Sequence, residues 1–137
     1  MAKRSKASER TLAYYKELGM PLWRVEQWIP NPRSPGGGTR RDLWNFADYL
    51  GMCPERGIVA VQSCGDQHSE HIRKFREPAI AAYIVQWLTY GRGRTHLDLI
   101  SWGKRKVKRG GKAMRYRARI ERITIETVSP GWADLME

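Results

Sequence analysis

The chain has 137 residues, which fits one domain with its own hydrophobic core. Its 25 Lys and Arg residues against 14 Asp and Glu residues give a formal net charge of +11, which indicates a polyanionic partner. We expect no membrane partner, because there is no run of about 18 apolar residues. We also expect no secretory signal, because the charged first residues are not followed by an apolar stretch. Cys53 and Cys64 lack zinc-ligand spacing, so we expect reduced thiols in a cytoplasmic protein.

The first third of the chain predicts a helix, a strand and a basic loop. Hydrophobic spacing indicates a helix over 5–18 that ends at Gly19, and a strand over 22–29 that contains Glu26. Residues 30–41 hold three prolines and three consecutive glycines, which predict a mobile loop. The arginines of this segment are Arg33, Arg40 and Arg41. Two interpretations stay open: a solvated connector, or a loop that orders against phosphates.

The middle of the chain predicts a hairpin followed by a long helix. Strands are expected at 46–52 and 57–64, joined by a Pro-Glu-Arg-Gly turn. Residues 58–61 are nearly all apolar, as expected for a strand covered on both faces. Apolar residues at spacings of three and four predict a helix over 67–90, which Pro78 kinks or divides into two.

The last third concentrates the positive charge. We expect a strand at 96–102, a basic turn at 103–113 and a strand at 114–128, with a bulge near Arg122 where the apolar phase slips. Basic residues at every second position make one face of this last strand an arginine row. A charge run is often only a solvated face, but charges of one sign repel, so we favour phosphate contact without base reading. The residues in question are Lys104, Arg105, Lys106, Lys108, Arg109, Arg115, Arg117 and Arg119.

Helices that alternate with strands in this order predict an α/β fold with a mixed five-stranded sheet flanked by helices. Near the strands stand three carboxylates and one carboxamide: Glu26, Asp42, Asp48 and Gln62. Asp48 and Gln62 lie on adjacent antiparallel strands, so we expect them to face each other at one end of the sheet. A single acidic residue is usually a surface group, but Gln62 ends a buried strand and needs a partner. Oxygen ligands of this kind hold Mg²⁺ or Mn²⁺ in phosphodiester hydrolysis.

The order of elements, Asp48 before a hairpin, and the strand ending Val59-Ala60-Val61-Gln62-Ser63-Cys64 resemble the PD-(D/E)XK nuclease superfamily. This superfamily includes restriction endonucleases and archaeal-type Holliday junction resolvases. The resemblance covers about Ser8 to Trp102 and is closest to phage and bacterial members in which Gln replaces the acid of the third strand. The segments that carry it are Arg24-Val25-Glu26, Arg41-Asp42-Leu43, Phe46-Ala47-Asp48 and Val61-Gln62.

The resemblance implies a restriction endonuclease-like fold over residues 1–137, in a bacterial or phage-infected cell. It implies that Asp48 is the central metal ligand and Gln62 the second, while Glu26 and Asp42 complete the metal shell or orient water. The sequence departs from the pattern at Cys64, which occupies the usual lysine position. A thiol cannot replace an ammonium group, and Lys74 is the candidate substitute.

Three hypotheses follow. The leading one is a DNA endonuclease that uses Mg²⁺ or Mn²⁺, directed at junctions or branches and acting as a homodimer because one site cuts one strand. The second is a catalytically lapsed nuclease fold that binds DNA or RNA in a replication, packaging or host-takeover assembly. The third is a basic ribonucleoprotein component, which the acidic cluster disfavours because carboxylates repel phosphates.

Overall fold

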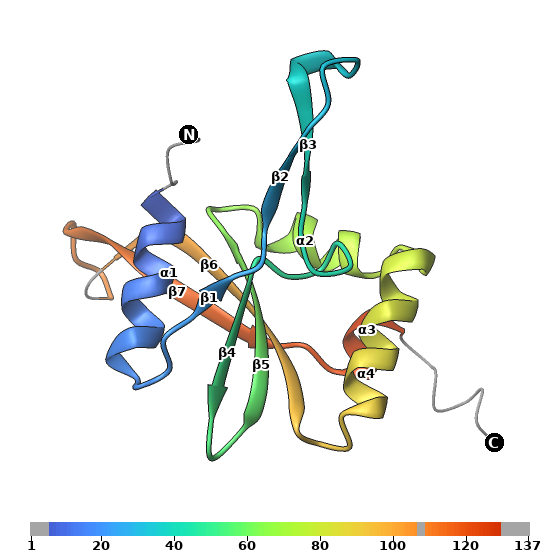
Figure 1. The fold of residues 1–137 in the computed structure, drawn as a ribbon. Helices are drawn as coiled ribbons and strands as arrows, with labels where there is room; N and C mark the ends of the chain where they lie inside the picture. The colour runs from blue at the N-terminus through green and yellow to red at the C-terminus, as the bar shows by residue number, and fades with distance from the viewer. Residues whose placement is uncertain (1–5, 107–108, 130–137) are drawn as a thin grey trace.

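The computed structural model describes residues 6–106 and 109–129. Five strands form one mixed sheet in the order β1–β4–β5–β6–β7 (Figure 1). Strands β5 and β6 pair in parallel and all other neighbours are antiparallel. The bounds are β1 Trp23–Arg24, β4 Tyr49–Cys53, β5 Gly57–Cys64, β6 Thr95–Lys106 and β7 Met114–Arg122. The predicted α/β architecture with a mixed five-stranded sheet is therefore confirmed.

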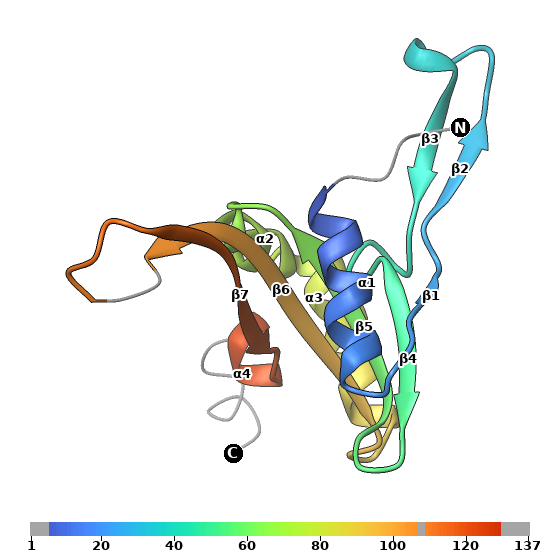
Figure 2. The ribbon, with the colours of Figure 1, turned by 90° about the vertical axis from the view of Figure 1, so that its left-hand side faces the viewer.

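Helices cover both faces of this sheet (Figure 2). Helix α1 (Lys6–Glu17) packs on one face, and α2 (His68–Phe75) and α3 (Pro78–Tyr90) form the crossover between β5 and β6 on the other. Pro78 lies in the first turn of α3, where a missing backbone N–H costs nothing, so the predicted helix over 67–90 is divided in two. Within the described ranges, no helix is long and apolar enough to cross a membrane.

The buried centre of the fold is β5, whose side chains alternate between two apolar cores. Val59 and Val61 pack with Tyr15 on the α1 face, and Ala60 packs under α2 and α3. All three β5 residues are fully buried, as predicted, whereas Ile58 at the start of the strand is exposed.

One buried charge links α1, the β4–β5 turn and β6. Asp98 of β6 is 2% exposed and accepts two hydrogen bonds from Arg56, both at 2.7 Å. The Tyr15 hydroxyl of α1 donates to the same carboxylate at 2.9 Å. A buried carboxylate with this many donors is well satisfied, which explains how an acid fits in the core.

A two-stranded arm projects from the body of the protein (Figures 1 and 2). Strands β2 (Gln27–Pro30) and β3 (Gly38–Arg41) pair antiparallel, and the 3₁₀ turn η1 (Pro35–Gly37) closes them. The predicted loop over 30–41 is therefore wrong for its second half, because those residues pair with the end of the predicted strand. Gly38 is required here, since a Cβ atom would lie 2.7 Å from the Trp28 ring.

The predicted strand over 22–29 is split between the sheet and the arm. Its break lies at Val25 and Glu26, whose backbone N–H groups both donate to the Asp48 carbonyl, at 2.9 and 3.2 Å. The arm is thus attached to the sheet at the backbone of Asp48.

Strands β6 and β7 form a long ribbon that extends past the rest of the sheet (Figure 2). Their register is continuous from the pair Asp98 and Arg122 to the pair Lys106 and Met114, so the predicted bulge is wrong. Strand β6 also includes residues 103–106, which the sequence assigned to a turn. The chain leaves the sheet after Arg122 and forms α4 (Ile125–Val128), so the last predicted strand is too long at its C-terminal end.

Candidate active site

Asp48 and Gln62 are direct neighbours at one end of β4 and β5. The Asp48 backbone N–H donates to the Val61 carbonyl at 2.9 Å, which continues the β4–β5 ladder by one residue. The Gln62 side-chain nitrogen then donates to Asp48 Oδ2 at 2.9 Å, and the Ser63 backbone N–H reaches the same oxygen at 3.4 Å. The predicted juxtaposition of Asp48 and Gln62 is therefore confirmed.

Glu26 and Asp42 lie close enough to change the ionisation of Asp48. Burial raises the pKa of Asp48 to about 7, and the Glu26 carboxylate adds to this rise by charge repulsion and a side-chain hydrogen bond. The Asp42 charge raises the pKa further, whereas the Ser63 N–H opposes the rise. Glu26 also pairs with Arg40 at 3.4 Å. The four predicted residues are thus gathered into one cluster, which we call the acidic cluster: Glu26, Asp42, Asp48 and Gln62.

Two oxygen atoms of the acidic cluster are buried and lack a hydrogen-bond partner among the described residues. They are Asp42 Oδ1 and Gln62 Oε1. A buried acceptor without a donor costs about 1–3 kcal/mol, so such atoms call for an explanation. Carboxylate and carboxamide oxygens are ligands for hard cations, which fits Mg²⁺ or Mn²⁺.

The geometry of the acidic cluster is nevertheless not that of a formed metal centre. In the described part of the chain, no three His, Cys, Asp or Glu side chains are arranged to hold a metal ion. Gln62 also turns its nitrogen, and not its oxygen, toward Asp48. The residues fit a cation by their chemistry, while their positions are those of a hydrogen-bonded acid–amide cluster.

The predicted lysine substitute is not drawn into the acidic cluster. Lys74 lies half-buried on α2, and none of the ion pairs found between described residues joins it to a carboxylate. Cys64 is buried at the end of β5, and this burial raises the pKa of its thiol to about 11. The Asp48 and Asp66 charges add to the rise, and a backbone hydrogen bond from Gln67 opposes it. Cys64 is therefore a neutral group at neutral pH, and the role of Lys74 stays a prediction.

The arginine row of β7 lies on the same face of the sheet as the acidic cluster. Arg119 pairs with Ser101 of β6, and Ser101 contacts His68 of α2, so this face carries α2 and α3. Gln62 pairs in parallel with Leu99, which shares the face of Ser101 because it lies two residues away. Exposed Arg115, Arg117 and Arg119 therefore lie on the same face of the sheet as the acidic cluster, with β6 between β7 and the Gln62 strand.

The other predicted phosphate contacts are distributed differently. Arg33, Arg40 and Arg41 are exposed along the arm, and Lys104 lies on the opposite face of the ribbon, near the Tyr116 ring. Arg109 is exposed in the turn that joins β6 to β7, and Arg105 and Lys106 belong to β6. Lys108 lies outside the described residues.

Two features of this face are not among the predicted sites. The first is His68, which is buried: its ring nitrogens contact Ser101 Oγ at 2.8 Å and Glu121 Oε1 at 2.9 Å. The contacts of His68 with Ser101 and Glu121 hold α2 on the ribbon. Because Ser101 is 1% exposed, its hydroxyl is not accessible as a nucleophile. The second feature is an aromatic hollow beside α3. Its signal in the sequence is the Tyr83, Trp87 and Tyr90 stripe at helical spacing.

The known proteins do not identify the chain. Comparisons with protein-family models, with curated proteins and with solved structures find no significant match. The function must therefore be inferred from the acidic cluster, the arginine row and their common face.

Proposed function

We propose that this chain is a metal-dependent nuclease that hydrolyses phosphodiester bonds in DNA, with a restriction endonuclease-like fold. The observation that carries the proposal is the acidic cluster at the end of β4 and β5, on the same face as the arginine row. Carboxylates repel a phosphate that arginines attract, and a divalent cation between them removes the conflict. A protein of net charge +11 that keeps three interacting, half-buried acidic groups on the same sheet face as an arginine row is best explained in this way.

Asp48 is the proposed central ligand, because the other three members of the acidic cluster all interact with it. Mg²⁺ or Mn²⁺ held there would neutralise charge on the phosphate and activate a water molecule. Asp42 Oδ1 and Gln62 Oε1 are the acceptors that lack a donor and would gain a partner. For Gln62 this requires rotation of its amide about the terminal side-chain bond, a soft torsion with two nearly equivalent settings.

The arginines would position the nucleic-acid backbone relative to the acidic cluster. Arg115, Arg117 and Arg119 alternate along β7 with about 6.8 Å between successive side chains, close to the spacing of phosphates along an extended strand. Arg33, Arg40 and Arg41 would contact the backbone along the arm. Contacts of this kind fix the register of the strand without reading its sequence. Cutting both strands of a duplex or junction would then use a homodimer, one site per strand.

A second function is favoured by one specific observation. The neutral, buried Cys64 stands where the resembled family has its lysine, and Gln62 offers Asp48 a nitrogen. A site without the ammonium group and without a preformed metal geometry fits a nuclease fold that only binds nucleic acid. With this second function, the chain would bind DNA or RNA through the same arginine row without cutting it.

Cleavage and binding assays separate the two functions. Supercoiled, linear, nicked and four-way-junction DNA are incubated with Mg²⁺ or Mn²⁺, using the wild type, Asp48→Asn and the matched control Asp66→Asn, an exposed acid beyond β5. The nuclease proposal expects metal-dependent cutting that Asp48→Asn reduces by about a hundredfold or more and Asp66→Asn leaves unchanged. Binding without metal-dependent cutting would instead establish the second function, and cutting that survives Asp48→Asn would refute the assignment of the site.

A further inference from the structure

An aromatic hollow of about 440 Å³ lies against the C-terminal half of α3, outside the acidic cluster. Four of its lining side chains are aromatic: Trp44, Tyr83, Trp87 and Tyr90. Trp44 and Tyr83 stack with ring centroids 6.1 Å apart and planes within 18°. Both remain about half exposed, at 50% and 44%, and Tyr90 is 76% exposed. Aromatic faces of this size usually lie in a core, so their exposure in one hollow suggests a ligand.

The backbone at Trp44 has a strained conformation. Trp44 and Asn45 have φ values of 46° and 64°, and the Phe46 N–H donates to the Leu43 carbonyl at 2.9 Å. This is a turn with two successive left-handed residues, a conformation that favours Gly and Asn and that a bulky side chain rarely adopts. Strain of this kind is concentrated at functional sites. Here its effect is to hold an indole ring at the surface beside Tyr83.

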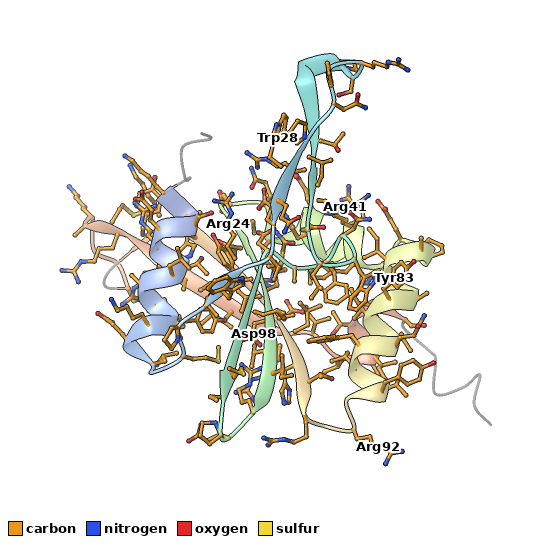
Figure 3. The ribbon with its side chains drawn as sticks, in the orientation of Figure 1. Arg24, Trp28, Arg41, Tyr83, Arg92 and Asp98 are labelled. Carbon is orange, nitrogen blue, oxygen red and sulfur yellow. The ribbon has the colours of Figure 1, made fainter. Side chains whose placement is uncertain are left out.

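The strained turn also connects the hollow to the acidic cluster. It lies between Asp42 and Asp48, and its ends are held together by the Leu43 N–H to Ala47 carbonyl hydrogen bond at 3.0 Å. Arg41 precedes this segment at the base of the arm, and Arg92 follows the end of α3 (Figure 3). Among the described residues, no acidic side chain lines the hollow. Its surroundings therefore suit an aromatic ring that carries phosphates on either side.

We infer that this hollow stacks an unpaired nucleobase of a strand whose backbone passes the acidic cluster. The inference rests on the proposed nuclease function for the identity of the polymer, and it names the substrate class: nucleic acid with a single-stranded or splayed segment next to the cut. Stacking tolerates every base, because each has an aromatic face, whereas a base inside a duplex has no free face. The hollow would thus select structure and not sequence.

Binding measured without metal tests this inference apart from catalysis. Fluorescence anisotropy with a labelled single-stranded DNA oligonucleotide, and with the duplex of the same sequence, is recorded in EDTA for the wild type, Trp44→Leu and Tyr83→Leu. We expect the wild type to prefer the single strand by about tenfold, and each variant to weaken that binding by about five- to a hundredfold. The control Trp23→Leu removes a tryptophan that is 77% exposed on β1, and we expect wild-type affinity.

The salt dependence distinguishes stacking from lost charge. Removing an aromatic ring releases no counterion, so the slope of log affinity against log salt concentration stays unchanged in Trp44→Leu. Arg41→Ala, in contrast, reduces that slope by about 0.7 for a single strand. Thermal unfolding checks that each variant is folded, and Tyr83→Leu, on an exposed helix position, supplies the test if Trp44→Leu does not fold.

Equal wild-type affinity for single strand and duplex would overturn the base site, as would folded Trp44→Leu or Tyr83→Leu with wild-type affinity. A matching RNA oligonucleotide that binds more tightly than the DNA would support stacking and assign the hollow to RNA. Absence of cleavage in the separate metal assay would refute the nuclease while leaving this binding result intact.

Discussion

Gln62 of β5 donates a hydrogen bond to Asp48 beside β4, while the oxygen of the same amide is buried and has no donor in the described part of the chain. The Gln62 amide thus stabilises the Asp48 carboxylate with its NH₂ group, which a cation would repel. Under the proposed function, the amide would keep its nitrogen toward Asp48 without metal and turn its oxygen toward a bound cation. The identity of residue 62 should therefore affect how stable the acidic cluster is without a cation.

Gln62→Glu tests this relationship. The change replaces a donor by a fourth acid, so in EDTA at pH 8 we expect the free energy of unfolding to fall by about 1–3 kcal/mol. Mn²⁺ should then stabilise the variant more than the wild type, because the added charge strengthens cation binding. Urea unfolding with and without Mn²⁺ measures both effects. Gln67→Glu, an exposed change just before α2, is the matched control, and a Gln62→Glu protein as stable as wild type in EDTA would contradict the idea.

The pKa of Asp48 makes stability depend on pH. The native carboxyl titrates at about 7 and the unfolded one near 3.8, so the native state holds the extra proton between these values. Stability attributable to Asp48 is therefore complete below pH 4, falls as the pH rises to 7, and stays low above it. We expect Asp48→Asn to be more stable than wild type at pH 8 by about 1–3 kcal/mol and equally stable at pH 4. Thermal unfolding across this range, with Asp66→Asn as control, checks the sign, and a wild type that gains stability toward pH 8 would refute it.

The buried Asp98 carboxylate depends on Arg56 for its compensation. Asp98 is 2% exposed, and Arg56→Ala leaves it the Tyr15 hydroxyl as its one side-chain donor among the described residues, so we expect the free energy of unfolding to fall by about 3–5 kcal/mol. Tyr15→Phe removes one hydrogen bond to a charged group and should cost about 1.5–3 kcal/mol. Chemical denaturation measures both. The control is Arg94→Ala, at an exposed arginine beside the same turn, which should lower stability by less than about 1 kcal/mol. If Arg56→Ala lowers stability no more than this control, Arg56 does not compensate the Asp98 charge.

The arginine row should act on affinity and not on stability. We expect Arg117→Ala to weaken binding of every duplex sequence alike and to reduce the salt slope by about 0.9, because one phosphate contact is lost. Lys16→Ala removes an exposed positive charge from α1, on the opposite face, and should leave the slope unchanged. Anisotropy titrations at several salt concentrations make the comparison, and equal slopes for the two variants would count against the arginine row as the phosphate path.

The sequence was sufficient where one local signal decides the structure. The apolar run of β5 predicted a buried central strand, Pro78 predicted the break between α2 and α3, and the short β4–β5 turn predicted that Asp48 and Gln62 would meet. Each of these depends on residues close together in the chain, or on a strand pair joined by a tight turn.

Features made by distant segments were not predictable in this way. Strand β3 of the arm lies at the end of a glycine- and proline-rich stretch and forms only by pairing with β2. Gly38 permits the close packing of Trp28 against it. The apolar shift after Arg122 looked like a bulge, but it reflects the chain leaving the sheet for α4. The hollow needs Trp44 beside Tyr83, which lie on separate elements, and no local pattern links them.

The attachment of the arm has a consequence for chain length. Because the N–H groups of Val25 and Glu26 both end on the Asp48 carbonyl, the distance from arm to acidic cluster is set by a count of residues and not by side-chain identity. Exposed side chains of the arm, such as Arg33 and Arg41, can therefore change without altering that distance. Inserting or deleting one residue between Glu26 and Gln27 would instead change the position of the whole arm relative to the acidic cluster, so the length of this segment fixes their separation.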